Sequence, residues 1–127
     1  MRLRCVIVDD SPAVLRAASE LLECQGILVV GVAATGVQAV RLIDELEPDV
    51  VLVDIDLGHE SGFDLARRLV ETPDRAGTRS ILISTHDGAD FAKLIAGSPA
   101  IGFLPKSDLS ASAIRQLLAR PHDEASD

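Results

Sequence analysis

The sequence contains no tryptophan and no tyrosine, and only 3 of its 127 residues are phenylalanine. The aromatic rings on which nucleic-acid-binding proteins usually stack bases are therefore scarce. Basic residues are also few, with 12 against 20 acidic ones, and they form no cluster larger than the pair Arg67-Arg68. A groove that follows a phosphate backbone needs clustered positive charge, so we expect no direct binding to nucleic acid by a chain of net charge −8.

Cysteine is rare as well, with Cys5 in an apolar run and Cys24 late in a helical stretch. Two cysteines at these positions form neither a disulfide framework nor a metal-binding spacing, and we predict two reduced packing residues in a reducing compartment. Met1 to Asp10 lacks the apolar region and cleavage site of a signal peptide, and no apolar stretch reaches membrane-spanning length. We therefore expect a cytoplasmic protein that does not associate with a membrane.

The length and composition indicate one globular domain. The 127 residues are 47% apolar and 25% charged, and a chain of this size buries enough surface to form a core without disulfides or a structural metal. We predict a domain over residues 1–120 and a polar C-terminal tail over 121–127.

Short apolar runs alternate with stretches of helical periodicity. The predicted strands are 5–8, 27–30, 50–53, 80–83 and 100–104, and the predicted helices are 12–25, 36–46, 62–71, 89–96 and 109–119. The runs are apolar throughout, as in parallel strands covered on both sides. Ser11-Pro12, Gly26 and Glu47-Pro48 mark helix boundaries. The fold class is α/β, a doubly wound parallel sheet of five strands with helices on both faces.

Polar side chains follow four of the predicted strands. Asp9-Asp10 follows the first strand, Asp54 the third and Ser84 the fourth, and Lys106 comes soon after the fifth. Because ligands bind at the carboxyl ends of the strands in open α/β sheets, we expect these side chains to meet in one site.

The residues expected at this site favour phosphoryl transfer. Crowded carboxylates repel one another, and a divalent cation with a preference for oxygen ligands, Mg²⁺, offsets that repulsion. One carboxylate then serves as the nucleophile toward phosphorus, while Lys106 and Ser84 contact the phosphoryl oxygens.

These residues resemble the receiver domains of two-component response regulators, which have a flavodoxin-like fold. The resemblance covers nearly the whole chain. It depends on Asp9-Asp10, on Asp54 with Gly62 eight residues later, on Ser84, and on the run from Phe103 to Lys106.

The resemblance implies a role for each site residue. Asp54 is the phosphoacceptor and, with Asp10, a Mg²⁺ ligand. Asp9 acts through water or the metal shell, and the backbone carbonyl of Asp56 is a further ligand. Ser84 and Lys106 contact the phosphoryl group, and the Phe103 ring changes rotamer together with Ser84 on activation.

The resemblance also implies partners. The phosphoryl donor is a histidine kinase or a phosphotransfer protein, and the fourth helix, fifth strand and fifth helix pass the signal to a downstream protein or to an output domain outside this sequence. A homodimer is compatible with the sequence. The chain is then a signalling domain with self-phosphorylation and slow autodephosphorylation chemistry, and not an enzyme.

Several positions depart from the family pattern. Ser107 stands where the family usually has a proline, so we expect a trans peptide bond after Lys106. Gly58 replaces another common proline and predicts a looser loop, and Thr85 replaces a small residue and narrows access to Asp54. Asp56 and His86 are predicted to flank the phosphoryl group and to make its hydrolysis depend on pH.

Two other functions fit parts of the sequence. Asp54 and Asp56 also resemble the nucleophile and acid/base pair of haloacid-dehalogenase-like phosphohydrolases, although those enzymes place this motif on an early strand. A flavin or nucleotide carrier would need a Gly/Ser/Thr-rich phosphate cradle after the first strand, where Asp9-Asp10 stands instead.

Overall fold

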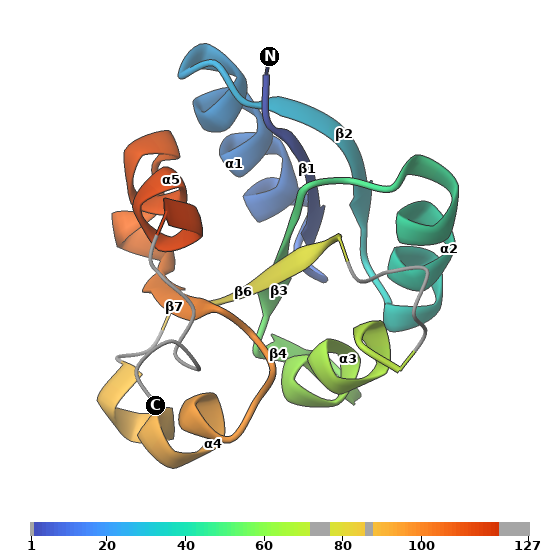
Figure 1. Ribbon diagram of the computed structural model, residues 1–127, viewed down its shortest axis with the longest axis vertical. Helices are drawn as coiled ribbons and strands as arrows, with labels where there is room; N and C mark the ends of the chain where they lie inside the picture. Colours follow the sequence, from blue (N-terminus) through green and yellow to red (C-terminus); the bar gives the residue numbers. More distant parts are fainter. Residues whose placement is uncertain (1, 72–76, 86–87, 120–127) are drawn as a thin grey trace.

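The computed structural model of the chain describes residues 2–71, 77–85 and 88–119, and its centre is a parallel sheet of five strands (Figure 1). The strands are β1 (Arg4–Val8), β2 (Leu28–Ala33), β3 (Val50–Asp54), β6 (Arg79–Ser84) and β7 (Gly102–Pro105), in the order β2-β1-β3-β6-β7. The predicted α/β fold class is confirmed. The predicted tail, 121–127, lies outside the described residues.

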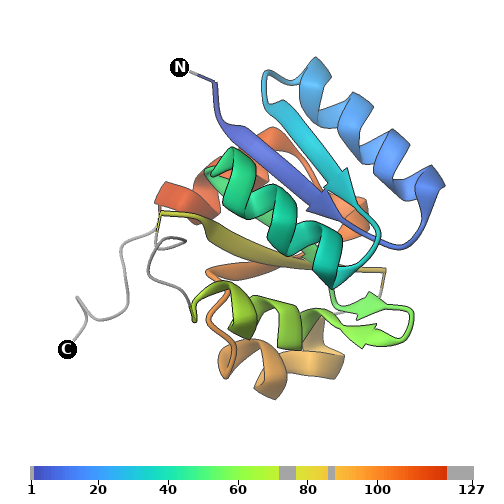
Figure 2. The same ribbon diagram turned by 90° about the vertical axis from the view of Figure 1, so that its right-hand side faces the viewer.

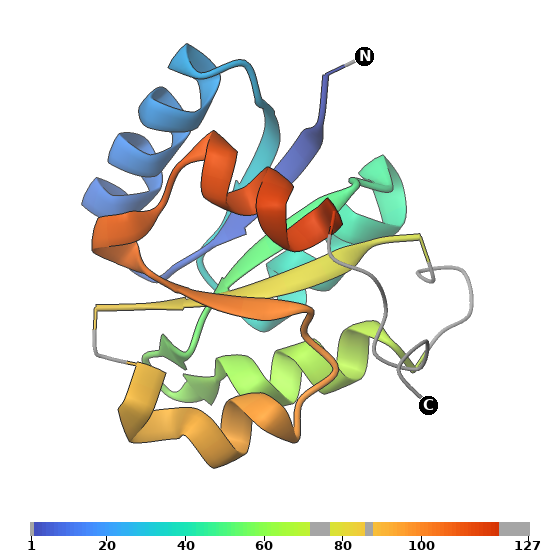
Figure 3. The ribbon, with the colours of Figure 1, turned by 60° about the vertical axis from the view of Figure 1, so that its left-hand side comes forward.

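Helices cover both faces of the sheet. They are α1 (Pro12–Cys24), α2 (Gly36–Leu46), α3 (Gly62–Leu69), α4 (Ala92–Ala96) and α5 (Ala111–Ala119). Figure 3 shows α1 and α5 together on one face, and α3 and α4 on the opposite face, where α2 also packs. Within the described ranges, no helix combines the length and the apolar content that crossing a bilayer requires.

The core has two halves, one on each side of the sheet. Val6 and Val8 of β1 pack toward α2 and α3, whereas Cys5 and Ile7 pack toward α1 and α5. All four side chains have no exposed surface, because successive side chains of a strand point to opposite faces and both faces are covered. This double burial explains why the strand sequences are apolar without alternation.

The predicted helix boundaries are confirmed at three places. Ser11 caps α1 by accepting a hydrogen bond from Val14 N at 3.3 Å, and Pro12 is the first helical residue. Gly26 follows α1 with φ of +94°, and Glu47 ends α2 in the left-handed region with φ of +48°. The described backbone contains no cis peptide bond, as we expected after Lys106.

Several elements differ from the sequence prediction. The fourth predicted helix begins as a 3-10 turn, η2 (Gly88–Phe91), which leaves only five α-helical residues, and no side chain caps α4. The fifth strand begins at Gly102 and is followed by a second 3-10 turn, η3 (Lys106–Asp108). The two 3-10 turns precede α4 and α5, and such turns are common at helix starts.

A two-stranded antiparallel hairpin, absent from the sequence prediction, follows β3. Its strands are β4 (Asp56–Leu57) and β5 (Glu60–Ser61), with Gly58 at the turn in a left-handed conformation at φ of +74°. Strands of two residues carry no periodic pattern, so the sequence offers no signal for them. Gly58, which we expected to loosen this loop, is the residue whose missing Cβ permits the turn.

The two cysteines differ in their surroundings. Cys5 is buried in β1, and burial raises the pKa of its thiol from 9.0 to about 12. Cys24 is exposed at the end of α1, so the prediction that both cysteines are packing residues is wrong for Cys24. The position of Cys24 late in a helical stretch did not show which way its side chain points, and at the last residue of α1 it faces solvent.

Candidate functional site

The strand registers bring the predicted site residues to one edge of the sheet. Val8 is opposite Val53, so the residues that follow them, Asp9 and Asp54, are neighbours. On the next two strands, Ser84 is opposite Pro105, and Lys106 follows directly. The expectation that these groups meet at the carboxyl ends of the strands is therefore met in the structure.

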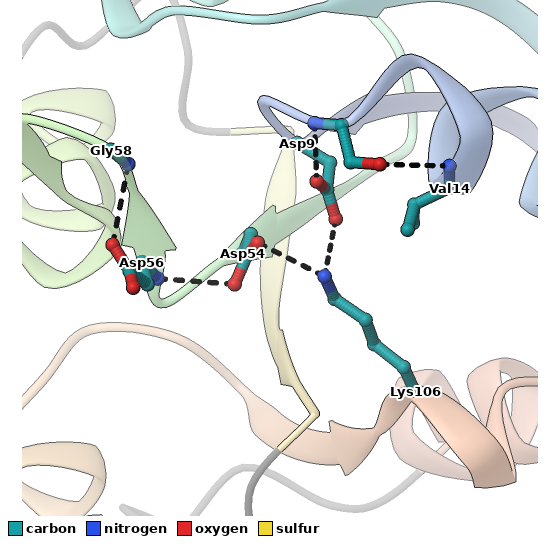
Figure 4. Close-up of polar contacts among 7 residues, drawn as sticks. Asp9, Val14, Asp54, Asp56, Gly58 and Lys106 are labelled. Atoms are coloured by element: carbon teal, nitrogen blue, oxygen red, sulfur yellow. Dashed lines mark hydrogen bonds and ion pairs between the residues drawn. The ribbon is translucent and has the colours of Figure 1, made fainter.

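Lys106 forms ion pairs with two buried carboxylates at this edge. Its Nζ lies 2.6 Å from Asp9 Oδ2 and 3.0 Å from Asp54 Oδ2 (Figure 4). Desolvation alone lowers the pKa of Lys106, but its close contacts with the carboxylates of Asp9 and Asp54 raise the pKa above its usual value. Lys106 is therefore a cation over the whole neutral range.

Asp54 is held at both carboxylate oxygens. Oδ2 accepts a hydrogen bond from Lys106, and Oδ1 accepts one from the backbone N–H of Asp56 at 3.1 Å. Burial raises the pKa of Asp54, while the Asp56 N–H and Lys106 act in the opposite direction. Removing this carboxylate from water disfavours its charge, so the neighbouring cation and N–H group are what keep it available as an anion.

Asp9, Asp10 and Asp54 form an acidic cluster in which one oxygen of each lies within 4.8 Å of the others. Asp9 Oδ1 accepts a hydrogen bond from Ser11 N at 2.9 Å, whereas the buried Asp9 Oδ2 makes no hydrogen bond of good geometry and contacts Lys106 as an ion pair. Hard, anionic oxygens with unused acceptor capacity are the donor set that Mg²⁺ prefers. These three residues therefore fit a magnesium ion.

Ser84, Thr85 and Asp56 line the same pocket, which has a volume of about 390 Å³. Ser84 is buried and reaches it from the end of β6, and Thr85 follows at the rim. The Asp56 side chain is outside the acidic cluster and accepts a hydrogen bond from Gly58 N at 3.2 Å. The role of its backbone carbonyl as a metal ligand stays a prediction. His86 lies outside the described residues. Phe103 is partly buried on β7, against the half-core that contains α3.

Gly62 explains the eight-residue spacing after Asp54. A Cβ at Gly62 would come within 3.0 Å of the Asp54 carbonyl oxygen and of Ile55 Cα, both of which are backbone atoms that cannot rotate away. Gly62 N also donates a 2.7 Å hydrogen bond to Ile55 O. The glycine therefore lets the start of α3 close tightly against the strand that carries Asp54.

Sequence reasoning missed Glu60, which faces away from the pocket on the hairpin. Both of its carboxylate oxygens accept hydrogen bonds from Gly36 N, at 3.0 and 3.2 Å. These two residues are 24 positions apart, and the hairpin that brings them together has no periodic signature. In the sequence, the signal for this contact is a glycine, Gly36, at the first position of a helix.

Comparison with known proteins adds an independent line of evidence. Residues 5–119 match the model of the response regulator receiver domain family. Among solved structures, the chain is similar to a two-component response regulator of the LuxR family from Aurantimonas sp. SI85-9A1, with 29% identity, a TM-score of 0.81 and coverage of 94% of this chain and 88% of that one. The response regulator domain of Thermotoga maritima CheB matches with 27% identity and a TM-score of 0.77, over 95% of this chain and 100% of that domain.

Among curated proteins, the chain is 36% identical over 109 residues to a protein-glutamate methylesterase/protein-glutamine glutaminase from Alkalilimnicola ehrlichii. The match covers 84% of this chain but 27% of that protein. Other curated relatives are also longer, and the chain spans 19% to 50% of their lengths.

Proposed function

Because this chain belongs to the response regulator receiver domain family, we propose that its acidic pocket accepts a phosphoryl group on Asp54 and that the domain acts as a phosphorylation-controlled switch. The observation that carries the proposal is the geometry of Asp54. Both of its carboxylate oxygens accept a hydrogen bond, one from Lys106 Nζ and one from the backbone N–H of Asp56, and the residue lines the pocket.

The reaction needs Asp54 as an anion. A carboxylate oxygen of Asp54 forms a bond to phosphorus, and the bond between phosphorus and the donor breaks, with its electron pair leaving on the donor atom. Burial opposes the ionised state of Asp54, and Lys106 and the Asp56 N–H offset that penalty. For a phosphohistidine donor, the departing atom is an imidazole nitrogen.

The pocket supplies positive charge for the phosphoryl oxygens. Lys106 is paired with two carboxylates before the reaction, and we infer that it moves its contact from Asp54 to a phosphoryl oxygen once Asp54 is phosphorylated. The hydroxyl group of Ser84, at the end of β6, would donate a hydrogen bond to a second phosphoryl oxygen. A bound Mg²⁺, held by Asp9, Asp10, Asp54 and the Asp56 carbonyl, would add positive charge that offsets the carboxylates and the incoming group.

We further propose that the switch is read by a partner. Its donor would be a histidine kinase or a phosphotransfer protein, and its target a downstream protein or an output domain. Lys106 and Ser84 contact the new charge only in the phosphorylated state, so they bias a two-state equilibrium toward it. With Lys106→Ala or Ser84→Ala, phosphorylation should persist while phosphate-dependent amide shifts at Phe103 and in α4 shrink.

The phosphohydrolase alternative gains no support from the comparisons, which match the receiver family over 5–119. The two functions also differ in stoichiometry. A receiver holds one phosphoryl group per chain, whereas a phosphohydrolase turns over many phosphomonoesters.

The test is incubation with a small acyl phosphate, with and without Mg²⁺, followed by intact mass and peptide mapping. We expect one added phosphoryl group on Asp54, dependent on Mg²⁺ and lost in Asp54→Asn. Asp64→Asn, which neutralises an exposed carboxylate on α3, is the matched control and should behave as the parent. A phosphate mapped to another residue would contradict the proposal, and sustained turnover would favour the phosphohydrolase.

A further inference from the structure

The β4–β5 hairpin is anchored to the start of α2 by the carboxylate of Glu60. Gly36 is the first residue of α2, and its N–H belongs to the helix turn that has no partner within the helix. Thr35 caps the helix by accepting from Gln38 N at 3.2 Å, which leaves the Gly36 N–H for Glu60. A carboxylate at a helix N-terminus is also favoured by the helix dipole. Figure 2 shows the hairpin beside this end of α2.

The other side of the same hairpin borders the acidic pocket. Glu60 is opposite Leu57 in the hairpin, and Gly58 forms the turn between them. A Cβ built on Gly58 would lie 3.2 Å from Asp10 Oδ2, so the turn is in close reach of that carboxylate. A shift of the hairpin therefore changes the position of Asp56 and Gly58 relative to Asp10.

The turn between β2 and α2 fixes the other wall of the pocket. Asp9 N donates a 3.0 Å hydrogen bond to Ala33 O, at the end of β2. Three residues later, Gly36 N holds Glu60. The segment from Ala33 to Gly36 is therefore bonded both to the backbone of Asp9 and to the hairpin that carries Asp56.

From these contacts we propose that Glu60 is a positioning residue for the acidic pocket: its carboxylate, bound to Gly36 N, sets the distance between the Asp56–Gly58 segment and the Asp9–Asp10 carboxylates and so tunes the affinity of the pocket for Mg²⁺. The proposal rests on the proposed function in that it assigns Mg²⁺ to this pocket. Glu60 itself is not among the residues that line the acidic pocket.

Gly36 provides a second way to break the same contact. A Cβ at Gly36 would approach Glu60 Oε1 closer than 3.0 Å, and Oε1 is the end of a flexible side chain, so Gly36→Ala displaces the carboxylate and leaves the backbone in place. Gly36→Ala and Glu60→Ala therefore both remove the contact between Gly36 N and the Glu60 carboxylate. Their effects should not add, because once the Glu60 side chain is absent the new methyl group has no carboxylate to displace.

The experiment uses the whole chain and MgCl₂ as the probe. Since the chain has no tryptophan or tyrosine, binding is followed by backbone amide resonances, at a temperature at which every variant is folded. The variants are Glu60→Ala, Glu60→Gln, Gly36→Ala and the double variant. Glu45→Gln, which makes the same charge change on the exposed side of α2, is the control.

For Glu60→Ala we expect the dissociation constant for Mg²⁺ to rise about 10-fold, the lower end of the effects seen when groups that hold metal ligands are removed. Glu60→Gln should fall between Glu60→Ala and the parent, because its amide oxygen still accepts from Gly36 N. Without Mg²⁺, Glu60→Ala should already shift the amide resonances of Asp56 and Gly58, whereas Glu45→Gln should not.

Two results would overturn the proposal: Mg²⁺ affinity in Glu60→Ala equal to that of the parent, or additive effects of Glu60→Ala and Gly36→Ala. Failure of the proposed function gives a different result. In that case the parent binds Mg²⁺ and the variants bind it more weakly, yet neither the parent nor any variant accepts a phosphoryl group from the acyl phosphate.

Discussion

The charged side chains at the two ends of the central sheet differ in their partners. At the amino end, Asp49 accepts a 2.9 Å hydrogen bond from Arg4 N, and the Arg4 guanidinium donates to the carbonyls of Leu46 and Glu47, at 2.6 and 3.1 Å. Each charged group there has its own backbone partners. At the carboxyl end, the carboxylates of Asp9 and Asp54 both pair with Lys106, and Asp10 belongs to the same acidic cluster.

This difference indicates that the amino end contributes to stability, while the carboxyl end keeps an excess of negative charge that the folded chain alone does not neutralise. Such an excess costs stability and is retained where a ligand supplies the missing charge. Removing a charged side chain should therefore lower the unfolding free energy at the amino end and raise it at the carboxyl end.

The largest effect is expected at the carboxyl end, from Gly62→Ala. The new methyl group meets the backbone of Asp54 and Ile55, so we expect a loss of about 3 kcal/mol of unfolding free energy, the upper part of the range for overpacking. Phosphorylation of Asp54 should fall with it. Denaturant unfolding measures the first effect and intact mass the second.

The matching substitution at the amino end is Gly26→Ala, where φ is positive but the nearest atom is 3.9 Å from the Cβ position. It should lower the unfolding free energy by about 1 kcal/mol, because of the left-handed backbone conformation alone, and leave phosphorylation of Asp54 unchanged. Equal costs for the two glycines would refute the steric account of Gly62.

The second prediction is at the amino end. Arg4→Met removes the charged hydrogen bonds to Leu46 O and Glu47 O, and should lower the unfolding free energy by about 1.5 kcal/mol. Asp54 phosphorylation should be unaffected, because the two ends share no partner. Arg16→Met, an exposed arginine on α1, is the control for loss of charge. A slower phosphorylation in Arg4→Met alone would show that the ends are coupled.

The third prediction has the opposite sign. Without Mg²⁺, Asp10→Asn removes one of three crowded carboxylates and should raise the unfolding free energy by about 1 kcal/mol, the size of one charge pair in a high dielectric. The stabilisation that the parent gains on adding Mg²⁺ should shrink in this variant. Thermal unfolding with and without MgCl₂ measures both. If Asp10→Asn destabilises the metal-free protein, the acidic cluster is not a source of strain.

The smallest effect on stability at neutral pH is expected from the two cysteines, which both lie near the amino end of the sheet. Exposed Cys24 should react with a thiol reagent in the native state, whereas Cys5 should stay unlabelled. Because the folded pKa of Cys5, about 12, is above its ordinary value of 9.0, its contribution to stability is complete below pH 9.0 and is lost as the pH rises toward 12. Mass spectrometry of labelled protein reports the site. Labelling of Cys5 as fast as Cys24 would mean that the amino end opens readily.

The sequence predicted much of the fold and of the pocket, for a physical reason that also explains the misses. The strands are buried on both faces, so their apolar runs are unmistakable, and parallel register then carries Asp9, Asp54, Ser84 and Lys106 to one edge without further information. The hairpin has two residues per strand and depends on a tertiary contact between Glu60 and Gly36. No local periodicity records such a contact.

The pairing of Lys106 was also only partly predicted. The sequence indicated that Lys106 contacts a phosphoryl group, whereas the structure shows it between Asp9 and Asp54. Which partner a flexible lysine selects depends on distances of a few ångströms, and these are set by packing and not by residue order.

The contact between Glu60 and Gly36 has a consequence for sequence evolution and for protein engineering. A side chain at position 36 and a carboxylate at position 60 compete for the same space, so in lineages related to this chain the two positions should change together. A mutation of Gly36 would be tolerated more readily after Glu60 is lost than before. The same dependence applies to chimeras: a transplanted β4–β5 hairpin with its glutamate needs a recipient whose second helix begins with glycine.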